Sequence, residues 1–156
     1  MPPGSGAAGS SDRPHLGTDN NMLSYPLDHV AVAVTSLEEA CRLFEPLAGE
    51  SSSPTEEIPA QGVRVCFVGS LELLEPLEPD SPVGRFLDRG GSGLHHIAFR
   101  VPDLSEAIAR LEADGFDLID RTPRLGARGH KVAFLHTRST GGTLVELVQG
   151  ESGSTS

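Results

Sequence analysis

One short segment of the chain occurs twice at a fixed separation. Leu27-Asp28-His29-Val30-Ala31 returns as Leu94-His95-His96-Ile97-Ala98, an offset of 94 − 27 = 67 residues. Identical residues at one offset predict two copies of one supersecondary unit, and each copy places a histidine early in a strand. The same offset also aligns Val34 with Val101, Leu37 with Leu104, Glu39 with Glu106, and Ala40 with Ala107.

Each copy is predicted to run strand, helix, strand, strand, strand. β-branched residues open the units at 27–34 and 94–101, with the histidine and small alanines on one face. Ser36 and Asp103 each stand three residues before a Glu, a capping box that predicts a helix start. Pro46 is expected to end the first helix early. The later strands are predicted at 56–58, 63–68, 71–74, 117–120, 131–136 and 143–148.

These elements predict an α+β fold, in which two βαβββ repeats at 27–75 and 94–149 form one curved mixed sheet. Residues 25–150 are predicted to be a single domain, because that length can bury a real core. Residues 1–24 are rich in Gly, Ser, Pro, Asp and Asn and lack the apolar core of a signal peptide. They are interpreted as a disordered extension, and 151–156 as a disordered tail.

The formal net charge of −10 argues against nucleic acid or an anionic membrane surface as a partner. No apolar stretch is long enough to span a bilayer. Cys41 and Cys66 are interpreted as small core residues in a reducing, cytoplasmic location. Five basic residues gather in the second repeat, where they form either an anion site or a solvated face: Arg121, Arg124, Arg128, Lys131 and Arg138.

Each repeat also carries a glutamate in its closing strand. Glu72 and Glu146 are 146 − 72 = 74 residues apart, and a longer second hairpin accounts for the excess over 67. If the repeats pack about a pseudo-twofold axis, these carboxylates converge with His29 and His96. Two imidazoles and two carboxylates suit a divalent transition metal with room for exchangeable ligands. Strand alternation places His95 on the opposite face, where packing or a structural hydrogen bond is expected.

The paired units with His, Glu, His and Glu resemble the vicinal oxygen chelate superfamily, which includes glyoxalase I. Within it the chain most resembles the methylmalonyl-CoA epimerase family, on the run Gly126-Ala127-Arg128-Gly129-His130-Lys131-Val132-Ala133-Phe134-Leu135-His136 and on Ser139-Thr140-Gly141-Gly142-Thr143. The similarity extends over 27–149. The resemblance implies that Glu146 is a catalytic base, and that the metal ligands are His29, Glu72, His96 and Glu146.

The resemblance implies metal-dependent epimerisation of (R)- and (S)-methylmalonyl-CoA, an isomerase reaction of propionate metabolism. A proton leaves and returns at carbon 2 through a metal-stabilised enolate. Co²⁺ is the favoured ion, with Zn²⁺, Mn²⁺, Ni²⁺ or Mg²⁺ as alternatives. The expected partners are a small-molecule acyl-CoA and a second copy of the chain in a homodimer. Some relatives carry a second base where this chain has Val65, which leaves Gln61 with a water, or Glu57, as candidates.

Two other functions fit this fold. One is a different metalloenzyme of the superfamily, a glyoxalase I-like lyase or a dioxygenase. The other is a non-catalytic small-molecule binding protein, a class whose members have lost the metal ligands, whereas all four positions here are His or Glu. An Fe(II) dioxygenase usually needs two His and one Glu, so Glu72 weighs against that alternative.

Overall fold

The computed structural model describes residues 24–150. The extension predicted at 1–24, apart from Ser24, and the tail predicted at 151–156 lie outside the described residues. Within the described part the chain forms one eight-stranded sheet in the order β2-β3-β4-β1-β5-β8-β7-β6. The strands are β1 (Leu27–Ala33), β2 (Glu56–Ile58), β3 (Val63–Val68), β4 (Leu71–Pro76), β5 (Gly93–Val101), β6 (Arg124–Leu125), β7 (Lys131–Leu135) and β8 (Val145–Gln149).

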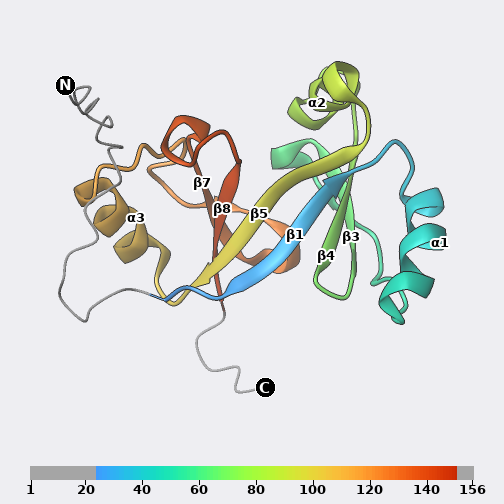
Figure 1. Ribbon diagram of the computed structural model, residues 1–156, viewed down its shortest axis with the longest axis horizontal. Helices are drawn as coiled ribbons and strands as arrows, with labels where there is room; N and C mark the ends of the chain where they lie inside the picture. Colours follow the sequence, from blue (N-terminus) through green and yellow to red (C-terminus); the bar gives the residue numbers. More distant parts are fainter. Residues whose placement is uncertain (1–23, 151–156) are drawn as a thin grey trace, which may run out of the picture.

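Two halves of the sheet have the same connectivity. β1 pairs in parallel with β4, and β5 pairs in parallel with β8, while β1 and β5 meet antiparallel at the centre. Figure 1 shows β1 and β5 crossing the middle of the molecule, with α1 and α3 at its two ends. The predicted mixed sheet of two βαβββ repeats is therefore confirmed. The helices are α1 (Leu37–Ala48), α2 (Pro82–Gly90) and α3 (Leu104–Ala113).

Each repeat buries its helix against the outer face of its own half-sheet. Apolar residues at helical spacing supply this contact in both halves. On the inner face, α2 packs over the first half, where Val83 joins Ala31, Ala33 and Leu74 in one cluster. The outer clusters consist of Val34, Leu37, Ala40, Cys66, Val68 and Leu73 in the first half, and of Val101, Leu104, Ala107, Ile108, Ala133 and Leu147 in the second.

Most local predictions are confirmed. The side chains of Ser36 and Asp103 accept hydrogen bonds from the backbone N–H groups of the Glu three residues later. The prediction that Pro46 ends the first helix is wrong, because α1 continues to Ala48. The helix stops instead at Gly49, which adopts φ 69° and donates its N–H to the Glu45 carbonyl.

Two further expectations have different outcomes. Residues 117–120 form no strand, and only an isolated bridge joins Leu118 to Leu135. Cys41 and Cys66 do pack in or against the core beneath α1, with their Sγ atoms 3.3 Å apart and both thiols free. In residues 24–150, no helix has the length and apolar character needed to cross a membrane.

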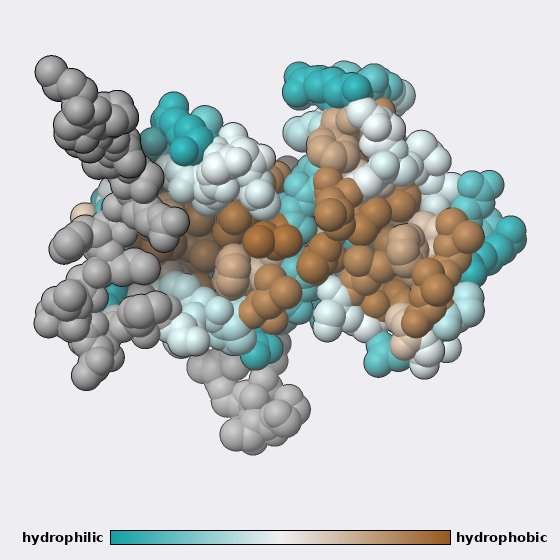
Figure 2. All heavy atoms as spheres, in the orientation of Figure 1, coloured by the Kyte–Doolittle hydropathy of each residue, from teal (hydrophilic) through white to brown (hydrophobic). Residues whose placement is uncertain are grey.

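Some large apolar side chains remain exposed. Leu94 of β5 is 74% exposed and Leu27 of β1 is 56% exposed, and Leu43 and Leu47 project from α1. Figure 2 shows apolar atoms gathered over the central strands and beside α1. Leu94 also lies beside the histidines, because it lines one cavity with His95 and His96.

Candidate metal centre

The four predicted ligands come together on the inner face of the sheet. Glu146 places Oε1 3.5 Å from His29 Nε2 and Oε2 3.5 Å from His96 Nε2. Glu72 lies 3.8 Å from His29 Nε2 and 3.9 Å from His96 Nε2 through its two oxygens. All four residues are only 4–5% exposed. Residues from four strands and both repeats therefore surround one point.

The pairing of the strands explains this convergence. His29 lies opposite Ala98, and His96 lies opposite Ala31. The same two alanines are the register partners of the glutamates, Ala31 of Glu72 and Ala98 of Glu146. Cross-strand partners share a face, so each small alanine leaves open space beside one imidazole and one carboxylate.

The donor set fits a metal ion. The Nε2 atoms of His29 and His96 are buried and have no hydrogen-bond partner. An unpaired buried nitrogen is costly, and coordination would satisfy both. Ligand atoms of His29, His96 and Glu72 all lie within 4.8 Å of one another. The rings of Phe67 and Phe134 stand edge-on to the two imidazoles and restrict their rotation.

Burial controls the protonation of the site. Burial, together with the charge of Glu72, raises the pKa of Glu146 to about 8, and burial raises the pKa of Glu72 to about 6. Burial also lowers the pKa of His96 well below its ordinary value, as do the charges of its two histidine neighbours. For His29, burial opposes protonation, but the Asp28 hydrogen bond and both glutamates outweigh it and raise the pKa. Without a metal, the carboxyl groups of Glu72 and Glu146 therefore take up protons at about pH 6 and about pH 8.

The Nδ1 atoms of both histidines are hydrogen-bonded to the residue that precedes each in the chain. Asp28 Oδ2 lies 2.7 Å from His29 Nδ1, and His95 Nδ1 lies 2.8 Å from His96 Nδ1. The prediction that His95 points to the opposite face is wrong, because the strand is irregular there and alternation breaks down. His95 does make the expected structural hydrogen bond, but its partner is His96.

A cavity of about 430 Å³ opens beside His96. Its wall is mostly apolar, and its polar lining includes Gln61, His95 and Arg124. A much smaller cavity, of about 20 Å³, lies on the other side of the centre, where Arg128 joins His29, Glu72 and Glu146. The larger cavity has room for a small acyl group, and it reaches the four converging side chains at His96.

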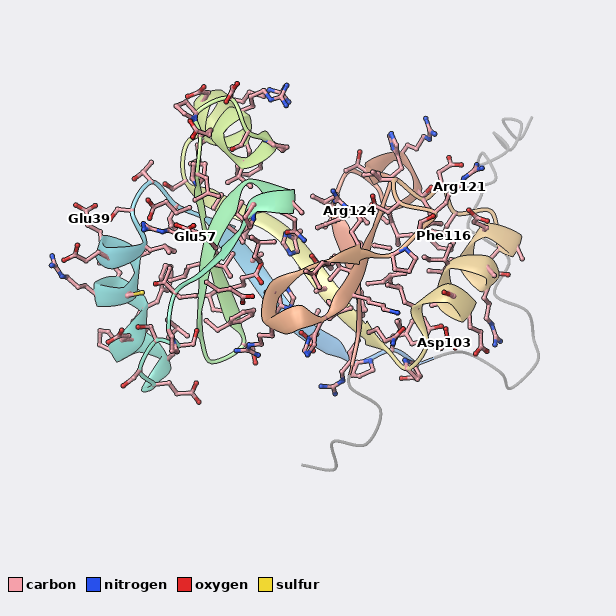
Figure 3. The ribbon with its side chains drawn as sticks, turned by 180° about the vertical axis from the view of Figure 1, so that it is seen from behind. Glu39, Glu57, Asp103, Phe116, Arg121 and Arg124 are labelled. Atoms are coloured by element: carbon pink, nitrogen blue, oxygen red, sulfur yellow. The ribbon has the colours of Figure 1, made fainter. Side chains whose placement is uncertain are left out.

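Members of the basic cluster make different local contacts. Arg121 and Arg138 form ion pairs with Glu112 and Asp117, at 3.5 Å and 2.7 Å. Arg124 lines the larger cavity, with its guanidinium 5.8 Å from the centroid of the Phe134 ring. In Figure 3, Arg124 lies near the middle of the molecule and Arg121 toward the α3 end.

The candidates for a second base lie on different faces. Glu57 is paired in register with Arg64, on the outer side, and its carboxylate is 3.8 Å from Arg64 Nε. Gln61 lines both cavities and donates through Nε2 to the Leu125 carbonyl at 3.4 Å. The neighbouring Glu56 shares the inner face instead, and sequence reasoning missed it. No sequence signal could have found it, because strand alternation does not continue through the turn at Pro59–Gln61, and only the register with Val65 in β3 gives Glu56 its face.

Comparison with known proteins identifies the class. Residues 28–134 match the Glyoxalase/Bleomycin resistance protein/Dioxygenase superfamily. The uncharacterized protein YqjC of Bacillus subtilis is 46% identical over 127 residues, covering 79% of this chain and 91% of the relative. The mitochondrial methylmalonyl-CoA epimerase of Dictyostelium discoideum is 40% identical over 127 residues, covering 78% and 76%.

A solved structure of similar fold belongs to the same class of protein. It is a Streptomyces coelicolor methylmalonyl-CoA epimerase in complex with 2-nitronate-propionyl-CoA, with 31% identity, a TM-score of 0.77, and coverage of 82% of this chain and 96% of that one. The chain belongs to the Glyoxalase/Bleomycin resistance protein/Dioxygenase superfamily, and within it to the family of the methylmalonyl-CoA epimerases. The predicted resemblance and the predicted isomerase class are both confirmed by these relatives.

Proposed function

We propose that the protein is a metal-dependent methylmalonyl-CoA epimerase, which interconverts the (R) and (S) forms by removing and returning the proton at carbon 2. The observation that carries this proposal is the convergence of His29, Glu72, His96 and Glu146 beside a cavity of about 430 Å³. Two similar proteins support the same substrate class: one is named a methylmalonyl-CoA epimerase, and the other is an epimerase in complex with 2-nitronate-propionyl-CoA.

The proposed ligands are His29, Glu72, His96 and Glu146. Imidazole and carboxylate donors suit Co²⁺, our first choice, and also Zn²⁺, Mn²⁺ or Ni²⁺, while Mg²⁺ is the least suited to imidazole. When bound, the ion supplies positive charge beside the carbonyl oxygens of the substrate, which makes the carbon 2 proton more acidic. The remaining work, orientation and proton transfer, belongs to the side chains around the cavity.

Glu146 is the proposed base. Burial, with the charge of Glu72, raises the pKa of Glu146 to about 8 in the metal-free site. Bound to the ion through one oxygen, this carboxylate would keep its other oxygen available to accept the proton. As the proton leaves, the electron pair of the C–H bond moves into the adjacent carbonyl and gives an enolate. The apolar walls formed by Leu74, Phe134 and Leu144 limit the access of water to that enolate.

The test begins with one pure epimer of methylmalonyl-CoA. The metal-loaded protein should convert it into an equal mixture, protein stripped with a chelator should not, and added Co²⁺ should restore the reaction. The alternatives are checked with the same preparation, using the glutathione hemithioacetal of methylglyoxal for lyase activity and oxygen uptake for dioxygenase activity. Turnover of the hemithioacetal, or oxygen uptake, without epimerisation would contradict the proposal.

We also propose a homodimer in the cytoplasm. Leu27 and Leu94 are exposed on the two central strands, an apolar surface of the kind that a partner subunit covers. Sedimentation of the full chain should give twice the monomer mass. A monomer at micromolar concentration would contradict the dimer and leave the proposed chemistry unaffected.

A further inference from the structure

We propose that Asp28 and His95 are the positioning residues of the metal centre, each fixing the tautomer and orientation of the histidine that follows it. This inference rests on the proposed metal site and is independent of the substrate. Neighbouring side chains of a regular strand point to opposite faces, so such contacts need a special backbone.

A β-bulge provides this backbone in the first repeat. Leu27 of β1 pairs with Phe99, and His29 pairs with Ala98. Two steps along β1 thus match one step along β5, which leaves Asp28 as the extra residue. Bulges bend a strand locally and redirect the side chain of the extra residue.

The second repeat has the matching bulge. Ala31 pairs with His96, while Val32 pairs with Leu94, so His95 is the extra residue on β5. The two bulged residues are 95 − 28 = 67 positions apart, which is the offset of the repeat. Both halves therefore place an extra residue directly before the ligand histidine and turn it toward Nδ1.

Metal coordination fixes the direction of these hydrogen bonds. A histidine that binds through Nε2 carries its ring proton on Nδ1. His29 then donates to Asp28 Oδ2 at 2.7 Å, and His96 donates to His95 Nδ1 at 2.8 Å. His95 must therefore keep its own proton on Nε2. The Phe86 ring stands edge-on to His95, with centroids 4.9 Å apart, and holds that acceptor in place.

The two supports differ in strength. Asp28 offers a carboxylate, and hydrogen bonds to a charged acceptor are about twice as strong as neutral ones. His95 offers a neutral nitrogen. Loss of such outer partners typically weakens metal affinity about 10- to 100-fold. We therefore expect Asp28→Ala to weaken binding more than His95→Ala.

The experiment measures metal affinity directly. Chelator-stripped protein is titrated with Co²⁺ and with Zn²⁺ against a competing chelator, without any acyl-CoA. Asp28→Ala and His95→Ala should each lower affinity by about 10-fold or more. His95→Asn should recover most of the loss, because its Oδ1 can accept from Nδ1–H near the position of the lost nitrogen. Ser92→Ala, an exposed change just before the same strand, is the matched control.

The thermal stability of the metal-free variants separates positioning from folding. A merely structural role would lower the unfolding temperature of metal-free His95→Ala and leave its affinity unchanged, which would overturn the proposal. Equal losses in His95→Ala and His95→Asn, or a parent protein that binds neither ion, would also overturn it. Epimerisation by the parent is assayed separately, so failure here and failure of the proposed function remain distinguishable.

A second, independent observation concerns the missing base. We infer that Glu56 is a proton-transfer group on the side of the substrate opposite Glu146. This inference rests on the proposed epimerisation, because inversion at carbon 2 needs an acceptor on one face and a donor on the other. Glu56 of β2 lies in register opposite Val65 of β3 and shares its inward face.

A series of contacts through Arg128 and Phe67 connects Glu56 with His29. Glu56 Oε2 accepts the backbone N–H of Arg128 at 2.9 Å, which leaves Oε1 free. Arg128 has φ 58° and is the only non-glycine residue in 24–150 with a positive φ, a strain typical of functional sites. Its guanidinium lies 3.8 Å from the centroid of the Phe67 ring, which stands edge-on to His29.

The step is balanced by the two carboxyl groups. For one epimer, Glu56 takes the carbon 2 proton, the C–H electron pair becomes part of the enolate, and protonated Glu146 returns a proton on the other face. The other epimer follows the reverse course. No oxidant or co-reactant is needed.

The test compares Glu56→Gln with Glu57→Gln, its exposed neighbour on the outer face. In D₂O, Glu56→Gln should slow interconversion about 100-fold or more. It should still exchange the carbon 2 proton of one epimer, the one that Glu146 deprotonates, and should lose exchange from the other. Glu57→Gln should match the parent. Parental interconversion in Glu56→Gln, or equal exchange from both epimers, would overturn the inference, while an inactive parent would refute the proposed function.

Discussion

The imidazole rings of His29 and His96 meet edge to face across the seam between the two repeats, with centroids 5.6 Å apart and an interplanar angle of 75°. Each stands opposite an alanine of the other strand, Ala98 for His29 and Ala31 for His96. Because alanine fills little of the inner face, both rings turn toward one centre. Neither repeat contains enough donors to build this centre alone.

This arrangement predicts the effect of filling the seam. Ala98 is 0% exposed and lies between His29 and Glu146 in register, so Ala98→Leu should displace both ligands. Overpacking costs about 1–3 kcal/mol, so the fold should survive. Co²⁺ titration should show affinity reduced by about 10-fold or more, as for other displaced ligand shells. The control is Val30→Leu, on the outer face, and an equal loss there would contradict the assignment.

Metal affinity should rise with pH. The raised pKa values, about 8 for Glu146 and about 6 for Glu72, mean that the metal must displace protons below these values. Apparent affinity should therefore increase from pH 6 to pH 8 and level off above. Calorimetry in buffers of different ionisation enthalpy should detect proton release at pH 6.5. Affinity that is constant across this range would contradict the electrostatic description.

The metal-free protein should show the opposite trend in stability. Both carboxyl groups have folded-state pKa values above the ordinary 4.5, so the folded state binds protons that the unfolded state has released. Their contribution to stability is present at low pH and is lost as pH rises from about 4.5 through 8. Thermal unfolding of stripped protein at pH 6 and pH 8 tests this sign. Glu146→Gln should reduce the difference in unfolding temperature between pH 6 and pH 8. An unchanged difference would mean that other groups cause the pH dependence.

Arg124 should influence substrate binding more than chemistry. It lines the larger cavity, and coenzyme A carries phosphate charges that an acidic protein must attract locally. Arg124→Gln should raise KM, with the smaller change at high salt, and should leave kcat close to that of the parent. Arg121→Gln is the control, because its side chain is 85% exposed and paired with Glu112. Equal KM values for both variants would place the phosphates elsewhere.

The fold and the convergence of the four side chains were predictable because the repeat is visible in the sequence. One offset aligned His29 with His96, and the closing strands supplied the two glutamates, so symmetry brought the four together. The bulges at Asp28 and His95 were not predictable, since alternation assumes a regular strand and no residue type marks these positions. The same limit hid Glu56, because the choice between Glu56 and Glu57 depends on exact register with Val65.

The basic cluster shows a different limit. Sequence proximity grouped Arg121, Arg124 and Arg138. Each forms a local ion pair, with Glu112, Asp120 and Asp117 respectively, and of the three only Arg124 also lines the larger cavity. Which charge reaches a cavity depends on loop conformation between 114 and 130, where turns rather than periodic elements set the path of the chain. Periodicity carries no information about such segments.

The most direct test of the account is solvent exchange at carbon 2 of methylmalonyl-CoA. The protein, loaded with Co²⁺ in D₂O, should introduce deuterium at carbon 2 as the epimers interconvert. The chelator-stripped protein and His96→Ala should do neither, and added Co²⁺ should rescue only the former. Epimerisation that persists undiminished in stripped protein and in His96→Ala, or a loaded parent that leaves carbon 2 fully protonated, would contradict metal-dependent proton transfer at carbon 2.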